Sequence, residues 1–166
     1  PQTTLLVGNL ATLWRWLLPD WSSEQRPTPH DVASAARETG VSYVLVTGIP
    51  TSSQHLENVL LSDGQVVARH GFVQFDAGFS GAGDTLTATL SALLANGVDL
   101  ESATAEALGY LDQALHHGFQ PGMGLVVPDR LFWARASQDD AGEEDSSAST
   151  NPSTDAFVFP DHDTRH

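Results

Sequence analysis

The chain has 166 residues, 40% of them hydrophobic, and a formal net charge of −14, because 21 acidic residues face seven basic residues that are all arginine. This composition fits one globular domain with a hydrophobic core, and the negative charge argues against binding to nucleic acid or to anionic membrane surfaces. The absence of lysine excludes a Walker-type phosphate loop, a protein-kinase ATP site and a lysine Schiff base, and the absence of cysteine excludes disulfides, thiol nucleophiles and cysteine-bound zinc.

The composition also bears on location. No apolar run is long enough to span a bilayer. A chain without cysteine is compatible with an intracellular setting, and we expect the cytoplasm. The first residue is Pro1 rather than methionine, and no charged-then-apolar leader follows it, so we expect that residues are missing upstream.

The first half of the chain alternates between extended and helical patterns. Residues 3–7 form a short apolar run suited to a buried strand, and residues 10–18 place their leucines and Trp14 on one helical face. A second helix is predicted to start at residues 28–31, where a hydroxyl cap, a proline and an acid follow in order, and to stop at Gly40. Residues 41–46 form a continuous run rich in apolar and β-branched residues. Such a run is typical of a parallel strand covered on both faces.

The second half begins with a predicted hairpin. Residues 56–61 and 65–75 read as strands on either side of an Asp-Gly turn. Two helices are predicted over residues 82–96 and 100–117, separated by Gly97, with Asp99 or Ser102 near the start of the second. This order of elements predicts a layered α/β domain with a mainly parallel sheet.

Composition changes sharply near residue 136. Residues 137–166 hold eight acidic residues and one arginine, and they contain little apolar surface. Such a segment cannot offset the entropy of ordering it, so we expect a disordered acidic tail. Residues 1–136 are therefore predicted to form the folded domain.

The clearest chemical signal lies where the glycines at 78, 81 and 83 precede a helix whose first turn carries Asp84. Free N–H groups at a helix start carry the positive end of the helix dipole, and a loop without side chains lets an anion approach them. A lysine-free protein could hold a phosphate in this way, with Asp84 placed to take a proton from an attacking alcohol. The alternative is a flexible turn followed by an ordinary helix-start acid.

The segment Gly81-Ala82-Gly83-Asp84 resembles the Gly-x-Gly-Asp motif of the ribokinase-like kinases, in particular the vitamin-kinase branch that contains pyridoxal kinase and hydroxymethylpyrimidine (phosphomethylpyrimidine) kinase. Two further segments are similar to that branch in order and spacing. Residues 7–10, Val-Gly-Asn-Leu, resemble its strand-ending Thr-Pro-Asn, and residues 44–48 resemble its Val-Thr-Gly strand end. The likeness covers roughly residues 3–135 and matches only the C-terminal half of such a kinase.

The resemblance implies a layered α/β/α sheet of the ribokinase-like kind and ATP-dependent phosphorylation of a hydroxymethyl group, with Mg²⁺. It implies that Asp84 is the general base and that the backbone N–H groups of Gly81, Ala82 and Gly83 form the anion hole for the moving phosphoryl group. It further implies that Asn9 faces the nucleotide phosphates and the metal. Thr47 and Gly48 would line the phosphate and ribose side of ATP.

The sequence departs from the family at two points. The family commonly has a glutamate three residues after the asparagine, where this chain has Thr12, so the metal ligands stay unknown. Many hydroxymethylpyrimidine kinases carry cysteine where this chain has Asp84, which favours a pyridoxal-kinase reading.

Other segments, at residues 13–16 and 118–133, resemble hydroxymethylpyrimidine kinases, and we favour that substrate, in thiamine biosynthesis, with pyridoxal or pyridoxine as the alternative. A further alternative is a nucleotide-binding or oligomerisation module without catalysis, since the half that would complete the vitamin pocket is absent. A last alternative is an α/β domain that acts through partner contacts. The aromatic residues of the first predicted helix, together with the resemblance to this family, imply a homodimer.

Overall fold

The computed structural model describes residues 3–134, and the eight helices and strands named below belong to a first unit that ends at Phe132. In chain order these elements are β1 (Leu5–Asn9), α1 (Leu10–Leu17), α2 (Pro29–Glu38), β2 (Tyr43–Ser52), β3 (His55–Ser62), β4 (Gln65–Val73), α3 (Ala82–Ala95) and α4 (Leu100–His116). The expected acidic tail, residues 137–166, lies outside the described residues. In the part of the chain that is described, no helix has both the length and the apolar character needed to cross a membrane.

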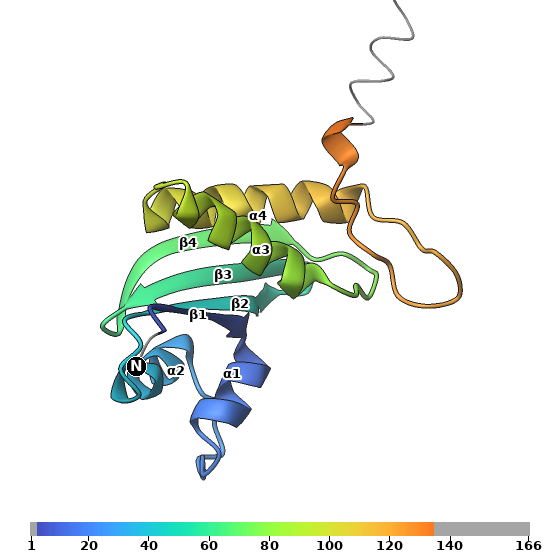
Figure 1. Ribbon diagram of the computed structural model, residues 1–166. Coiled ribbons are helices and arrows are strands. Elements are labelled where there is room, and N and C mark those ends of the chain that lie inside the picture. Colours follow the sequence, from blue (N-terminus) through green and yellow to red (C-terminus); the bar gives the residue numbers. More distant parts are fainter. Residues whose placement is uncertain (1–2, 135–166) are drawn as a thin grey trace, which may run out of the picture. The chain divides into compact units, whose positions relative to one another are not determined.

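The four strands form one sheet in the order β1-β2-β3-β4 (Figure 1). Only β1 and β2 are parallel, joined by a crossover that contains α1 and α2, whereas β2, β3 and β4 follow one another as antiparallel neighbours. The expected α/β class is confirmed, but the expectation of a mainly parallel sheet is wrong for the described residues. The continuous apolar run in β2 reflects burial on both faces, and an antiparallel strand with helices on both faces has the same pattern.

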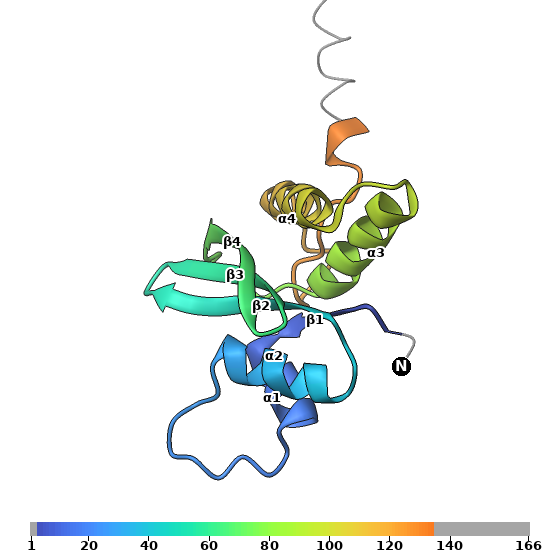
Figure 2. The ribbon, with the colours of Figure 1, turned by 90° about the vertical axis from the view of Figure 1, so that its left-hand side faces the viewer.

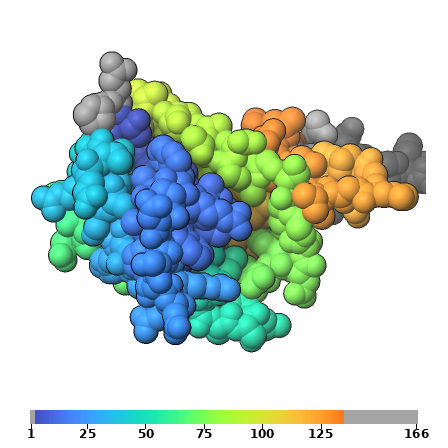
Figure 3. Space-filling model, turned by 90° about the horizontal axis from the view of Figure 1, so that it is seen from below, coloured from blue at the N-terminus to red at the C-terminus, as the bar shows by residue number. Residues whose placement is uncertain are grey.

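Helices cover both faces of the sheet, which confirms the layered α/β/α arrangement within this unit. In Figure 2, α1 and α2 lie below the sheet and α3 and α4 lie above it, and Figure 3 shows the face formed by α1 and α2. Alternate residues of β2 and β3 supply the two cores. Val44, Val46 and Val59 pack with α1 and α2, while Leu45 and Leu60 pack with α3 and α4. Each fully buried side chain of this size stabilises the fold by about 1.5–3 kcal/mol.

Local chemistry fixes where three of the elements begin or turn. Thr28 and Asp31 form a reciprocal capping box at the start of α2, where the sequence predicts a hydroxyl cap and an acid in the first turn. Asp99 caps α4 by accepting the Ser102 N–H at 3.1 Å. Between β3 and β4, Asp63 (φ 48°) and Gly64 (φ 74°) make the hairpin turn, which needs positive φ at both positions.

Strand β2 is longer than the sequence predicts, because it does not end at Thr47. Its parallel pairing with β1 stops at the Asn9–Thr47 pair, and its pairing with β3 shifts register between Val46 and Ile49. Gly48 lies in this irregularity with φ 67°, a conformation that side chains disfavour. The strand then continues to Ser52 as one arm of a hairpin.

Candidate functional site

The glycine-rich segment leads directly into α3, as predicted. Gly81 is the N-cap residue, with φ 84°, and Ala82, Gly83 and Asp84 form the first turn. The segment before the helix is held by a distant part of the chain, because Ser80 donates to the Val126 carbonyl at 2.9 Å and Val126 donates to the Gly78 carbonyl at 3.0 Å. The turn is therefore fixed on both sides, by its helix and by an extended segment.

The N-terminus of α3 lacks the side-chain cap that the other three helices of the described unit have. Asn9, Thr28 and Asp99 each accept a backbone N–H at the start of α1, α2 and α4, whereas Gly81 has no side chain to do so. Among residues 3–134, no hydrogen bond satisfies the N–H groups of the first turn of α3. These donors, together with the positive end of the helix dipole, are suited to an anionic group.

Asp84 is exposed in this first turn and lines a cavity of about 540 Å³ along the flank of α3. The other lining residues are small or polar, including Thr85, Ala88, Tyr110 and Arg130. A carboxylate at this position lies within one turn of the free N–H groups. It can accept a proton from a hydroxyl group whose oxygen approaches an anion held there.

A second cavity, of about 210 Å³, opens on the other side of the same turn. Ala82 lines it together with Thr47 and Gly48 from β2, and apolar side chains from the hairpin and α4, among them Phe72 and Leu108, line the rest. The structure thus brings Thr47 and Gly48 to the start of α3, and their predicted role toward ATP stays a prediction. Neighbouring residues of one helical turn face a mainly apolar cavity on one side and the cavity with Asp84 on the other.

Asn9 lies at the same end of the sheet, opposite Thr47 in the parallel register. Its Oδ1 accepts the Thr12 N–H at 2.8 Å, which makes Asn9 the cap of α1. With Gly48 and Arg26 it lines a third cavity of about 260 Å³. The cap engages one lone pair of the side-chain oxygen, and the predicted role toward phosphates or a metal stays a prediction.

The sequence does not indicate two polar residues near these cavities. Asn58, on β3, is buried, and its Oδ1 accepts the Gly48 N–H at 2.9 Å, which holds the irregularity of β2 in place. Arg130 lies far along the chain, yet its Nε donates to Thr85 Oγ1 at 2.9 Å on α3. Asn58 is one polar residue within a mainly apolar strand, and Arg130 is not part of a cluster of basic residues in the sequence. Neither therefore shows a sequence pattern that predicts a position near the cavities.

The described residues do not form a metal centre of their own. No group of three or more histidine, aspartate or glutamate side chains among residues 3–134 could hold a metal ion. Thr12 supplies a neutral hydroxyl in place of the family's glutamate, and the Asn9 oxygen is engaged in the helix cap. Mg²⁺ is usually held by one or two carboxylates together with substrate phosphates, and the carboxylates that line the first two cavities are Asp84 and Asp112.

Solved structures with the same fold come from vitamin kinases. Pyridoxal kinase from Staphylococcus aureus, in complex with AMP-PCP and pyridoxal, matches with a TM-score of 0.68 and 20% identity over 81% of this chain and 50% of its own. Pyridoxal kinase from Bacillus subtilis, as an ADP complex, matches with a TM-score of 0.63 and 21% identity over 80% and 51%. A candidate phosphomethylpyrimidine kinase from Bacteroides thetaiotaomicron matches with a TM-score of 0.60 and 18% identity over 82% and 48%.

The chain thus spans about half the length of the proteins whose fold it shares. No curated protein matches it by sequence. The family model for phosphomethylpyrimidine kinase, in contrast, matches residues 1–129, which include all of the helices and strands described above. The predicted resemblance is confirmed, and the chain belongs to the phosphomethylpyrimidine kinase family.

Proposed function

We propose that this protein transfers the γ-phosphoryl group of ATP to the hydroxymethyl group of a B-vitamin precursor, with hydroxymethylpyrimidine or its phosphate, in thiamine biosynthesis, as the first candidate. The observation that carries this proposal is the uncapped start of α3, which has Asp84 in its first turn and a cavity on each side. Family membership supports the reaction class.

In this proposal the two cavities hold the two reactants. The mainly apolar cavity beside Thr47 and Gly48 suits the base and ribose of the nucleotide. Because Ala82 also lines this cavity, the phosphates of a nucleotide bound there would lie next to the free N–H groups of α3. The acceptor occupies the cavity with Asp84. This arrangement is consistent with the nucleotide analogue and the vitamin that were bound together in the Staphylococcus aureus enzyme.

The chemistry needs one proton transfer and one displacement. The Asp84 carboxylate takes the proton of the acceptor hydroxyl as that oxygen attacks the γ-phosphorus, and the bond from this phosphorus to the bridging oxygen breaks to release ADP. The N–H groups of Gly81, Ala82 and Gly83 stabilise the negative charge on the moving phosphoryl group. We derive no step through Mg²⁺; when bound beside the phosphates, it would neutralise part of their charge.

A matched pair of variants tests the role of Asp84. Glu101 is also an exposed acid in the first turn of a helix, α4, so Glu101→Gln reproduces the helix-dipole effect of Asp84→Asn without touching either cavity. We expect Asp84→Asn to lower kcat by about 10²- to 10⁴-fold and Glu101→Gln to leave it unchanged. Equal rates in the two variants would remove Asp84 as the base.

Pyridoxal is the second candidate acceptor, because an aspartate at position 84 is the feature that distinguishes this chain from many hydroxymethylpyrimidine kinases. Steady-state rates with hydroxymethylpyrimidine, its phosphate and pyridoxal decide between them. A chain that binds AMP-PCP in calorimetry but turns over none of the three acceptors acts as a nucleotide-binding module. A chain that shows no heat of nucleotide binding contradicts the proposal as a whole.

A further inference from the structure

Arg130 lies against the first turn of α3, although 45 residues separate it from the helix residue that it contacts. Its Nε donates to Thr85 Oγ1 at 2.9 Å, and this hydroxyl donates in turn to the Gly81 carbonyl at 2.8 Å. A Cβ atom on Gly81 would lie 3.2 Å from Arg130 Nη2. The guanidinium group is therefore adjacent to the N-cap of α3.

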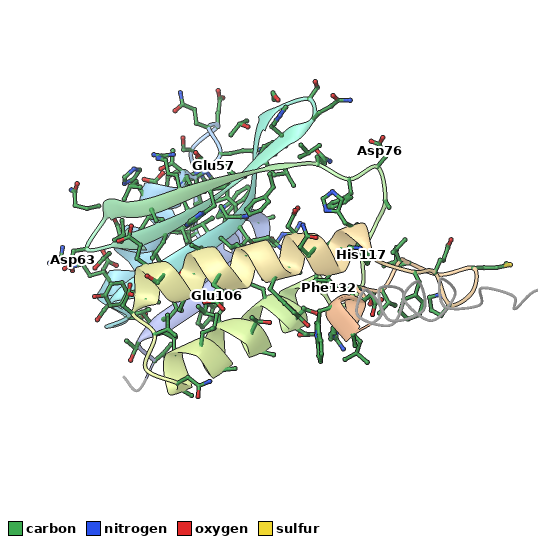
Figure 4. All side chains as sticks on the ribbon, turned by 90° about the horizontal axis from the view of Figure 1, so that it is seen from above. Glu57, Asp63, Asp76, Glu106, His117 and Phe132 are labelled. Atoms are coloured by element: carbon green, nitrogen blue, oxygen red, sulfur yellow. The ribbon has the colours of Figure 1, made fainter. Side chains whose placement is uncertain are left out.

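The backbone around Arg130 is held in this place by α4. Tyr110 Oη donates to the Arg130 carbonyl at 2.7 Å, and the preceding residue, Asp129, donates its N–H to the Ala114 carbonyl at 2.8 Å. Two residues further on, Phe132 stacks on His117 with ring centroids 5.3 Å apart, and Figure 4 shows the two side chains together at the end of α4. The position of Arg130 is thus set by tertiary contacts on both sides.

Arg130 differs from two other arginines of the described chain because it forms no ion pair with a carboxylate. Arg37 forms an ion pair with Asp63, and Arg69 forms one with Glu57. Within residues 3–134, no carboxylate lies within ion-pair distance of the Arg130 guanidinium, and its Nη1 and Nη2 groups have no hydrogen-bond partner. Two donor groups of a permanently charged side chain therefore stay available next to the unsatisfied N–H groups of α3.

We propose that the guanidinium of Arg130 binds the phosphoryl group held at the N-terminus of α3 and neutralises its charge. Guanidinium groups bind phosphate oxygens through paired N–H donors, and these charge-assisted hydrogen bonds are about twice as strong as neutral ones. Arg130 and Asp84 line the same cavity, so the cation lies on the side from which the acceptor approaches. In a chain with no lysine, Arg130 supplies the positive charge that the moving phosphoryl group needs.

This inference rests on the proposed function, and nucleotide affinity separates the two. Calorimetry measures the binding of AMP and of AMP-PCP to the wild-type chain, to Arg130→Gln and to Arg37→Gln. The last variant is the control, because it removes the same charge from an exposed ion pair with Asp63. We expect Arg130→Gln to bind AMP-PCP about tenfold more weakly while its affinity for AMP is unchanged, and we expect Arg37→Gln to match the wild type for both.

A purely structural role of Arg130 would lower both affinities together, since AMP and AMP-PCP share the adenosine part. Equal AMP-PCP affinities in Arg130→Gln and Arg37→Gln would overturn the role of Arg130 and leave the proposed function standing. No AMP-PCP binding to the wild type would overturn both. Arg130→Lys keeps the charge but not the paired donors, so we expect an affinity between those of Arg130→Gln and the wild type, and urea unfolding checks that each variant is folded.

Discussion

Two glycines in the same turn of α3 are expected to respond in opposite ways to the addition of one methyl group. Gly81 has φ 84°, so Gly81→Ala forces an L-residue into the left-handed region at a cost of about 1–2 kcal/mol. Gly83 lies within the helix, and a Cβ placed there meets no atom within 4 Å. Gly83→Ala should therefore stabilise the chain by about 0.5–1 kcal/mol, because alanine loses less backbone entropy on folding.

Urea denaturation followed by tryptophan fluorescence measures both changes on the same scale, because the chain has four tryptophans. The free energies of unfolding of the two variants should differ by about 1.5–3 kcal/mol, with the wild type between them. Equal free energies for Gly81→Ala and the wild type would mean that the left-handed N-cap is not the native conformation. In that case the placement of the free N–H groups beside Arg130 would be wrong as well.

The remaining predictions concern stability. Thr28→Ala removes the hydroxyl that caps α2 and should lower the free energy of unfolding by about 1 kcal/mol in urea, whereas Thr28→Ser should not. The pKa of Asp31 lies below its usual 3.8 because Thr28 donates hydrogen bonds to the carboxylate, so this group stabilises the fold above that pH and stops doing so as the pH falls through the lowered value. Asp31→Asn should accordingly be less stable than the wild type at neutral pH, and the difference should shrink as the pH falls through the lowered pKa of Asp31; a difference that stays constant with pH would contradict this account. Asn58→Leu leaves the Gly48 N–H without its acceptor and should cost about 1–3 kcal/mol in the same denaturation series. Leu90→Ala, in the core between the sheet and α3, should cost about 2–5 kcal/mol, and a loss below 1 kcal/mol would show that this core collapses around the cavity.

Features that depend on neighbouring residues could be predicted from the sequence. The Thr28 cap at the start of α2, the Asp-Gly hairpin turn and the start of α3 at the glycine motif all involve groups within four positions of one another. Short-range chemistry of this kind leaves a signature in residue order, because the same side chains must follow at fixed spacing.

Features that depend on tertiary contacts could not be predicted in this way. Strand direction is one example, since β2 is buried on both faces by helices and its apolar run looks the same whether its neighbour is parallel or antiparallel. Arg130 is another, because only the folding of α4 brings it to Thr85. Asn58 is a third, since a polar residue inside a strand can face solvent as easily as a buried N–H group.

The link between the glycine motif and the segment at Val126 makes the site depend on an exposed loop. Met123 is fully exposed, and its neighbours Gly122 and Gly124 have open space around them, so this loop is an accessible target for a protease. Cleavage there would remove the covalent link on one side of the segment that binds Gly78 and Ser80 and carries Arg130, so that only its contacts with α4 and its neighbours hold it in place, while the sheet and both cores stay joined. A nicked chain should therefore keep its circular dichroism spectrum and lose phosphate affinity. The secondary structure would then be retained after the site has lost its function.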